Sequence, residues 1–234
     1  MSTEQKEDPG TKAHGKNSPR SPVAGAAAEI AAQAGIELAV PGISLTVLTP
    51  DEALRELLAG NERFAANRLT SVQHDLEVLK GRTADKQEPF AAVLACADSR
   101  VPVELLFDQT IGHIFVTRIA GNIVTPEIIA SLEYGVAVLG VKVLLVLGHT
   151  SCGAVRAAMN TDAVPGQISV LYKHLRPAVE KSGGDLDRAV ELNAEHQLGL
   201  LRMLSTVIRE AAKGGKLVLR AGVYELATGR VGLR

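Results

Sequence analysis

The sequence lacks tryptophan, and aromatic residues make up only 3% of its 234 positions. Hydrophobic residues still amount to 46%, so a sizeable core is expected from alanine, valine, leucine and isoleucine. A strong charge of either sign is also missing: the formal net charge is −1, and no basic stripe carries interleaved aromatic residues. A nucleic-acid partner is therefore not expected. Charges and glycines interrupt every apolar run before it is long enough to span a bilayer, so no membrane partner is expected either.

Cysteine is scarce as well: the chain has two cysteines, Cys96 and Cys152. Two cysteines so far apart do not suggest a disulfide scaffold in a chain of this length, and they are better interpreted as intracellular metal ligands. The predicted location is the cytoplasm, with export by an atypical N-terminal signal as the alternative. A signal peptide would need an unbroken apolar stretch, and Glu29 and Glu37 interrupt the alanine-rich one.

The composition changes along the chain and predicts two parts. Residues 1–22 mix charged residues with Gly, Ser and Pro and show no hydrophobic periodicity, which predicts disorder. The alanine-rich stretch 23–40 predicts a short amphipathic helix, which we expect to pack on a second subunit. We therefore divide the chain into a disordered tail with a helical arm, 1–44, and a folded domain, 45–234.

Apolar runs alternate with helical stripes from residue 45 onwards. We expect strands at 90–95, 114–117, 141–147 and 216–223, and helices at 49–67, 76–80, 125–140, 151–159 and 185–212. This alternation predicts an α/β fold with a mainly parallel four-stranded sheet flanked by helices. A turn at Thr228-Gly229 predicts a short antiparallel addition at the C-terminal end.

Two short stretches at predicted strand ends carry the candidate metal ligands. Cys96 follows the strand at 90–95, and His149 follows the strand at 141–147, with Cys152 three residues later. Two thiolates and one imidazole suit tetrahedral zinc and leave a fourth position open, where water can be activated. The His-x-x-Cys pair alone fits a buried structural cysteine beside a capping histidine equally well. Cys96 at a second strand end favours the metal site.

Asp98 and Arg100 follow the first candidate ligand and lie two residues apart. In an extended segment both project to the same side, where arginine can hold a carboxylate through two hydrogen bonds. Such a pair would keep Asp98 ionised and let it accept a hydrogen bond from metal-bound water or hydroxide. The alternative is a surface ion pair of little energetic consequence.

The paired motifs strongly resemble those of the β-class carbonic anhydrases. The resemblance covers about residues 47–234 and includes further stretches: Arg118-Ile119-Ala120-Gly121-Asn122, Ser131-Leu132-Glu133-Tyr134 and Gly222-Val223-Tyr224. It implies that Cys96, His149 and Cys152 are zinc ligands, and that Asp98 and Arg100 form the catalytic dyad. The implied reaction is the reversible hydration of carbon dioxide to bicarbonate and a proton, by attack of zinc-bound hydroxide.

The resemblance also implies a substrate pocket and an assembly. Gln87 matches a glutamine that hydrogen-bonds the substrate or bicarbonate, and the Gly153 amide is expected to face the substrate. Phe115 and Tyr134 match residues that line the apolar pocket, with ordinary core packing as the alternative. Because the family builds this pocket at a dimer interface, a dimer or a tetramer is expected.

Three other functions are compatible with the same residues. The first is a related zinc hydrolase of carbon disulfide or carbonyl sulfide, since the same hydroxide can attack those carbons. The second is a non-catalytic structural zinc protein, which would have no need of the Asp98–Arg100 pair. The third is a metal-free enzyme with Cys152 as its nucleophile, which stoichiometric zinc would contradict.

Overall fold

The computed structural model describes residues 48–70, 86–160 and 164–234. The predicted tail at 1–22, the arm helix at 23–40 and the helix at 76–80 lie outside these residues. Within the described ranges, no helix is both long and apolar enough to cross a membrane.

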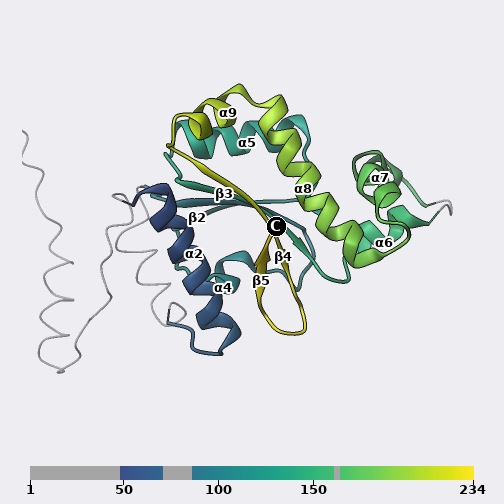
Figure 1. Ribbon diagram of the computed structural model, residues 1–234, viewed down its shortest axis with the longest axis horizontal. Helices are drawn as coiled ribbons and strands as arrows, with labels where there is room; N and C mark the ends of the chain where they lie inside the picture. Colours follow the sequence, from purple (N-terminus) through teal and green to yellow (C-terminus); the bar gives the residue numbers. More distant parts are fainter. Residues whose placement is uncertain (1–47, 71–85, 161–163) are drawn as a thin grey trace, which may run out of the picture. The chain divides into compact units, whose positions relative to one another are not determined.

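Five strands form one sheet in the order β2-β1-β3-β4-β5 (Figure 1). The strands are β1 (Ala91–Ala95), β2 (Ile114–Arg118), β3 (Val143–His149), β4 (Val218–Tyr224) and β5 (Val231–Leu233). The first four run parallel, and β5 pairs antiparallel with β4. The predicted parallel sheet with a short antiparallel C-terminal addition is therefore confirmed.

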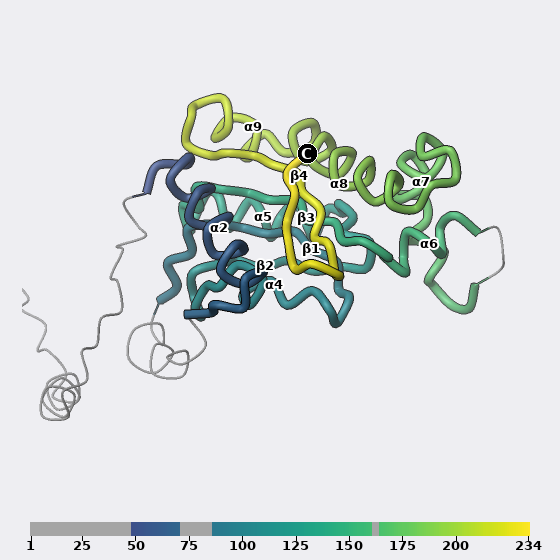
Figure 2. The backbone as a smooth tube through the Cα atoms, turned by 60° about the horizontal axis from the view of Figure 1, so that its bottom comes forward, coloured from purple at the N-terminus to yellow at the C-terminus, as the bar shows by residue number. Residues whose placement is uncertain are grey.

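Helices cover both faces of the sheet. One face carries α2 (Pro50–Ala65) and α4 (Val103–Leu106), and the other carries α5 (Pro126–Ala137), α8 (Leu186–Leu204) and α9 (Thr206–Lys213) (Figure 1). The other helices within the described ranges are η2 (Ala120–Asn122), α6 (Gly153–Met159), η3 (Ile168–Leu171) and α7 (Tyr172–Lys181). Of these, α6 directly follows the carboxyl end of β3 and lies beside α7 (Figure 2).

Alternate residues of the central strands face two separate cores. Val93 of β1 belongs to the core beneath α2, together with Leu57, whereas Leu94 belongs to the core beneath α5 and α8, together with Leu132 and Leu198. Because β1 and β3 are buried on both faces along their whole length, their sequences are continuous apolar runs rather than alternating ones.

The predicted single helix over 185–212 is wrong, because the chain breaks at Ser205. That residue is extended, with φ −102° and ψ 115°, and it ends α8 and caps α9. Its hydroxyl accepts from the Ile208 N–H at 3.1 Å and donates to Glu133 on α5 at 2.6 Å. Serine offers the backbone such an alternative partner, and the contact with α5 stabilises the break.

Candidate metal centre

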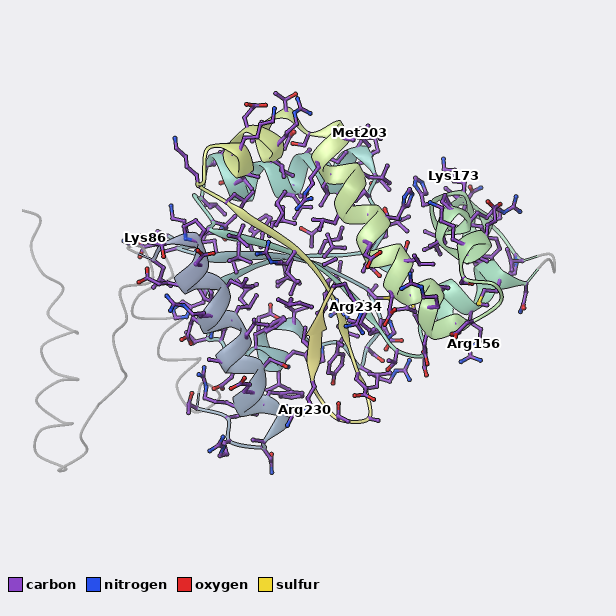
Figure 3. All side chains as sticks on the ribbon, viewed as in Figure 1. Lys86, Arg156, Lys173, Met203, Arg230 and Arg234 are labelled. Carbon is purple, nitrogen blue, oxygen red and sulfur yellow. The ribbon has the colours of Figure 1, made fainter. Side chains whose placement is uncertain are left out.

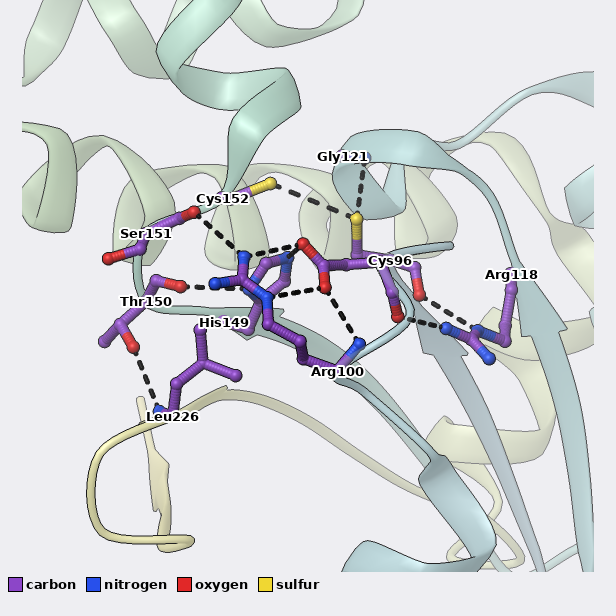
Figure 4. A network of polar contacts seen from close by, with 10 residues as sticks. Cys96, Arg100, Arg118, Gly121, His149, Thr150, Ser151, Cys152 and Leu226 are labelled. Carbon is purple, nitrogen blue, oxygen red and sulfur yellow. Dashed lines mark hydrogen bonds and ion pairs between the residues drawn. The ribbon is translucent and has the colours of Figure 1, made fainter.

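The two ligand-bearing stretches meet because β1 and β3 are neighbouring parallel strands. Ala95 pairs with Leu147, so the residues that follow β1 lie beside the end of β3. The ligand atoms of Cys96, His149 and Cys152 all lie within 4.8 Å of one another, and all three residues are buried. Figure 4 shows the two sulfurs and the imidazole converging on one point beyond the sheet. The structure thus places the three predicted ligands together.

The donor atoms have the spacing and orientation that a zinc ion requires. The two sulfurs are 4.0 Å apart, too far for a disulfide, whereas tetrahedral zinc with Zn–S bonds of about 2.3 Å separates two sulfurs by about 3.8 Å. His149 Nδ1 lies 3.0 Å from the Thr150 carbonyl, which can only accept, so this nitrogen carries the proton. Nε2 is then a bare acceptor, and it is buried without a protein partner among the described residues. This residue set therefore fits zinc.

The two thiols are electrostatically coupled. A hydrogen bond from Cys152 lowers the pKa of Cys96, and the bond from the Gly121 amide adds to this effect against the opposing influence of burial. The same sulfur–sulfur bond and burial raise the pKa of Cys152. The protein alone thus favours one thiolate and one thiol, and a divalent cation would be needed to hold both sulfurs deprotonated.

The turn after β3 brings Cys152 back towards His149. Ser151 adopts a left-handed conformation with φ +57°, and Cys152 is the N-cap residue of α6, without a side-chain capping bond. Thr150 anchors this turn to the end of β4: its N–H donates to the Tyr224 carbonyl at 2.9 Å, and its hydroxyl accepts from the Leu226 N–H at 3.1 Å. The Thr150 carbonyl that orients His149 is therefore held from two sides.

Asp98 and Arg100 form the predicted pair. The Arg100 Nε donates to Oδ1 at 2.9 Å and Nη2 donates to Oδ2 at 2.8 Å, while the Arg100 backbone N–H also reaches Oδ1 at 2.9 Å. The guanidinium holds the pKa of Asp98 well below its usual range. Asp98 Oδ2 lies 3.8 Å from His149 Nε2. An ionised acceptor therefore lies beside the unpartnered ligand atom.

Two further residues support the ligand segment, and sequence analysis gave neither a role. Arg118, the last residue of β2, donates from Nε to the Cys96 carbonyl at 3.0 Å and from Nη2 to the Asp98 carbonyl (Figure 4). The Gly121 N–H donates to the Cys96 sulfur at 3.3 Å. Both residues belong to the stretch 118–122, which is part of the resemblance to the β-class enzymes. That match was the sequence signal that could have identified their role.

The predicted substrate residues do not all lie at this centre within one chain. Gly153 follows Cys152 directly, but Gln87 precedes β1, at the opposite end of the strand from Cys96. Figure 3 shows this separation, with Lys86, the neighbour of Gln87, and Arg156 of α6 on opposite sides of the molecule.

Phe115 and Tyr134 form a pair away from the ligands. Phe115 is paired with Ala92, about 10 Å along β2 before the level of Arg118. Its ring lies 6.2 Å from that of Tyr134, which is 48% exposed. Both lie at the β2 edge of the sheet, on the side that α5 covers.

A family model described as carbonic anhydrase matches residues 91–231. Carbonic anhydrase 2 of Mycobacterium tuberculosis is 37% identical over 193 residues, covering 79% of this chain and 93% of that protein. The carbonic anhydrase of Mycolicibacterium smegmatis is also 37% identical, with the same coverage of both chains.

Solved structures show the same relationship. One of the tetrameric β-carbonic anhydrases of Sordaria macrospora has a TM-score of 0.63 at 25% identity and covers 77% of this chain and 95% of that one. A Coccomyxa β-carbonic anhydrase in complex with acetazolamide has a TM-score of 0.62 at 29% identity, covering 77% of this chain and 85% of that one.

Proposed function

This chain belongs to the β class of carbonic anhydrases, and from that premise we infer that it catalyses the reversible hydration of carbon dioxide. The observation that carries this assignment is the buried group of Cys96, His149 and Cys152, whose ligand atoms lie within 4.8 Å of one another. Zinc bound there supplies the Lewis acid that makes water a nucleophile near neutral pH.

The roles of the surrounding side chains follow from their hydrogen bonds. We propose that Asp98, ionised and held in place by Arg100, accepts a hydrogen bond at Oδ2 from the attacking group and so turns its lone pair towards carbon dioxide. His149 keeps its proton on Nδ1 through the Thr150 carbonyl, which leaves Nε2 free for the metal. The Gly153 amide, directly after Cys152, is proposed to face the substrate.

We further propose that the complete pocket forms between two copies of the chain. Gln87, Phe115 and Tyr134 lie away from the ligands of their own chain, and β2 is an unpaired edge of the described sheet. A second copy that approaches this edge would bring the three residues to the metal centre. The tetrameric assembly of the Sordaria enzymes supports this proposal.

Subunit complementation tests the shared pocket. Cys96→Ser and Gln87→Ala chains, each purified as an inactive enzyme, are mixed under conditions that allow subunits to exchange. A mixed dimer contains one complete pocket, with ligands from the Gln87→Ala chain and the glutamine from the Cys96→Ser chain. Recovered activity supports the proposal, and a mixture that stays inactive after proven exchange contradicts it.

The hydration activity is tested by stopped-flow measurement together with zinc analysis of the same samples. Wild type should hold one zinc per chain and hydrate carbon dioxide, whereas Cys96→Ser should lose most of both. Ala97→Ser is the matched control, because it adds the same hydroxyl one residue later at an exposed position outside the ligand group. A Cys96→Ser protein with full zinc and full rate would contradict the assignment. Parallel assays with carbon disulfide and carbonyl sulfide separate the related hydrolase activity.

A further inference from the structure

Helix α8 carries two buried amide side chains that belong to neither the ligand group nor the Asp98–Arg100 pair. Asn193 is 1% exposed and Gln197 is fully buried, and the two lie one helical turn apart on the same face. A buried amide destabilises the fold unless its donors and acceptors are paired. The partners of these two amides therefore indicate what they do.

The two amides hold the segment that follows β2. The Asn193 Nδ2 donates to the Gly121 carbonyl at 2.9 Å, and the Gln197 Oε1 accepts from the Val124 N–H at 2.8 Å. They also hold each other, because Gln197 Nε2 donates to Asn193 Oδ1 at 3.0 Å and to the His174 carbonyl at 3.1 Å. The segment is thus fixed at two points, by residues more than 70 positions away in the chain.

That segment reaches the metal centre through Gly121. The N–H of this glycine donates to the Cys96 sulfur at 3.3 Å, and its carbonyl is the group that Asn193 holds. Its backbone is left-handed, with φ +75°, and a Cβ there would lie 3.0 Å from a methyl carbon of Leu175. Glycine is therefore required at this position, from which its N–H reaches the sulfur and its carbonyl reaches Asn193.

We propose that Asn193 and Gln197 are positioning residues for the metal ligand Cys96. By fixing residues 121–124, they keep the Gly121 N–H on the sulfur, which draws electron density from the thiolate and orients it towards the metal. Loss of a group that hydrogen-bonds a metal ligand directly, as the Gly121 N–H does, typically changes metal affinity by about 10- to 100-fold. The proposal rests on the zinc site proposed above and deepens it by naming what holds one of the ligands.

The test replaces the amides and measures the metal directly. Asn193→Leu removes the bonds to Gly121 and Gln197, and Gln197→Met removes the bonds to Val124, Asn193 and His174 while keeping the side-chain length. Because both amides act through the Gly121 segment, we expect each variant to bind zinc about 10-fold more weakly in competition with a chelator, at the lower end of that range. In the cobalt(II)-substituted proteins the sulfur-to-cobalt charge-transfer band should move to lower energy, since a sulfur without its N–H donor gives up electrons more easily.

Asn61→Leu is the matched control for loss of a buried amide. Asn61 is 4% exposed on α2; it donates to the Leu106 and Gly229 carbonyls at 3.1 and 2.9 Å and accepts from the Val231 N–H at 2.8 Å, so none of these bonds involves Cys96 or residues 121–124. This variant should lose stability but keep the wild-type zinc affinity and cobalt spectrum. If Asn193→Leu does not fold, Gln197→Met decides the question with the same two measurements.

The outcomes separate this proposal from the function itself. Weaker zinc binding and a shifted band in the α8 variants but not in Asn61→Leu support it. α8 variants that match Asn61→Leu in both readouts overturn it and leave the zinc site intact. A wild-type protein that binds neither metal would instead overturn the proposed function and this proposal together.

Discussion

Gly60 in the middle of α2 offers a sharp test of how the fold supports the catalytic segment. By helix propensity alone, Gly60→Ala should stabilise the protein by about 1 kcal/mol. The structure predicts the opposite sign, because a Cβ at this position would lie 1.8 Å from the carbonyl oxygen of Phe107 and 2.7 Å from its carbonyl carbon. Phe107 is fully buried at the end of α4, which follows the Asp98–Arg100 segment in the chain.

The expected size of the effect follows from what must move. The obstacle is backbone rather than the flexible end of a side chain, so α2 must lift away and loosen the packing of Ala53 and Leu57. Overpacking of a core costs about 1–3 kcal/mol, occasionally more, and this contact belongs at the upper end. After the propensity gain is subtracted, Gly60→Ala should destabilise the fold by about 2 kcal/mol.

Gly199 of α8 is the matched control. It is exposed in a helix interior, and a Cβ there meets no atom within 4 Å. Gly199→Ala should therefore stabilise the fold by about 1 kcal/mol. At about 2–4 °C of Tm per kcal/mol, the control should rise by about 2–4 °C and Gly60→Ala should fall by about 4–8 °C.

Urea and thermal unfolding of the zinc-loaded proteins, at one protein concentration, measure both changes, because bound metal and assembly would otherwise shift the midpoints. If both substitutions stabilise the protein alike, the close approach of α2 to Phe107 is wrong. If neither changes the midpoint, the propensity argument fails as well.

Three further predictions concern the metal centre. Arg100→Ala removes both side-chain bonds to Asp98 and should abolish most hydration while zinc content stays unchanged; full activity would remove the pair from the mechanism. Thr150→Val leaves the Leu226 N–H without its acceptor, which should cost about 1–3 kcal/mol and speed the loss of zinc to a chelator; wild-type zinc retention would argue against this anchor for His149. Two thiolates neutralise the zinc charge, so the rate should rise on the alkaline side of neutrality, and a flat profile from mildly acid to mildly alkaline pH would contradict this reasoning.

Much of the fold and of the ligand group could be predicted because the signals are local. The capping box at Thr49 and Glu52 starts α2 where expected, since the hydrogen bonds that define it join residues three apart. The continuous apolar runs of β1 and β3 marked strands buried on both faces. Cysteine and histidine at the ends of two such strands already pointed to a metal, because thiolate and imidazole are the ligands that zinc prefers.

Contacts between distant parts of the chain decided the rest. Only strand order could show that β1 and β3 are neighbours, and only the contact of Ser205 with Glu133 on α5 explains why the last long helix is broken in two. In the sequence, Asn193 and Gln197 are ordinary polar residues of a helix. Only the fold shows that their amides hydrogen-bond Gly121 and Val124. Local pattern thus determined which residues can bind a metal. Tertiary packing decided which backbone groups hold those residues in place, because such partners leave no periodic signal in the sequence.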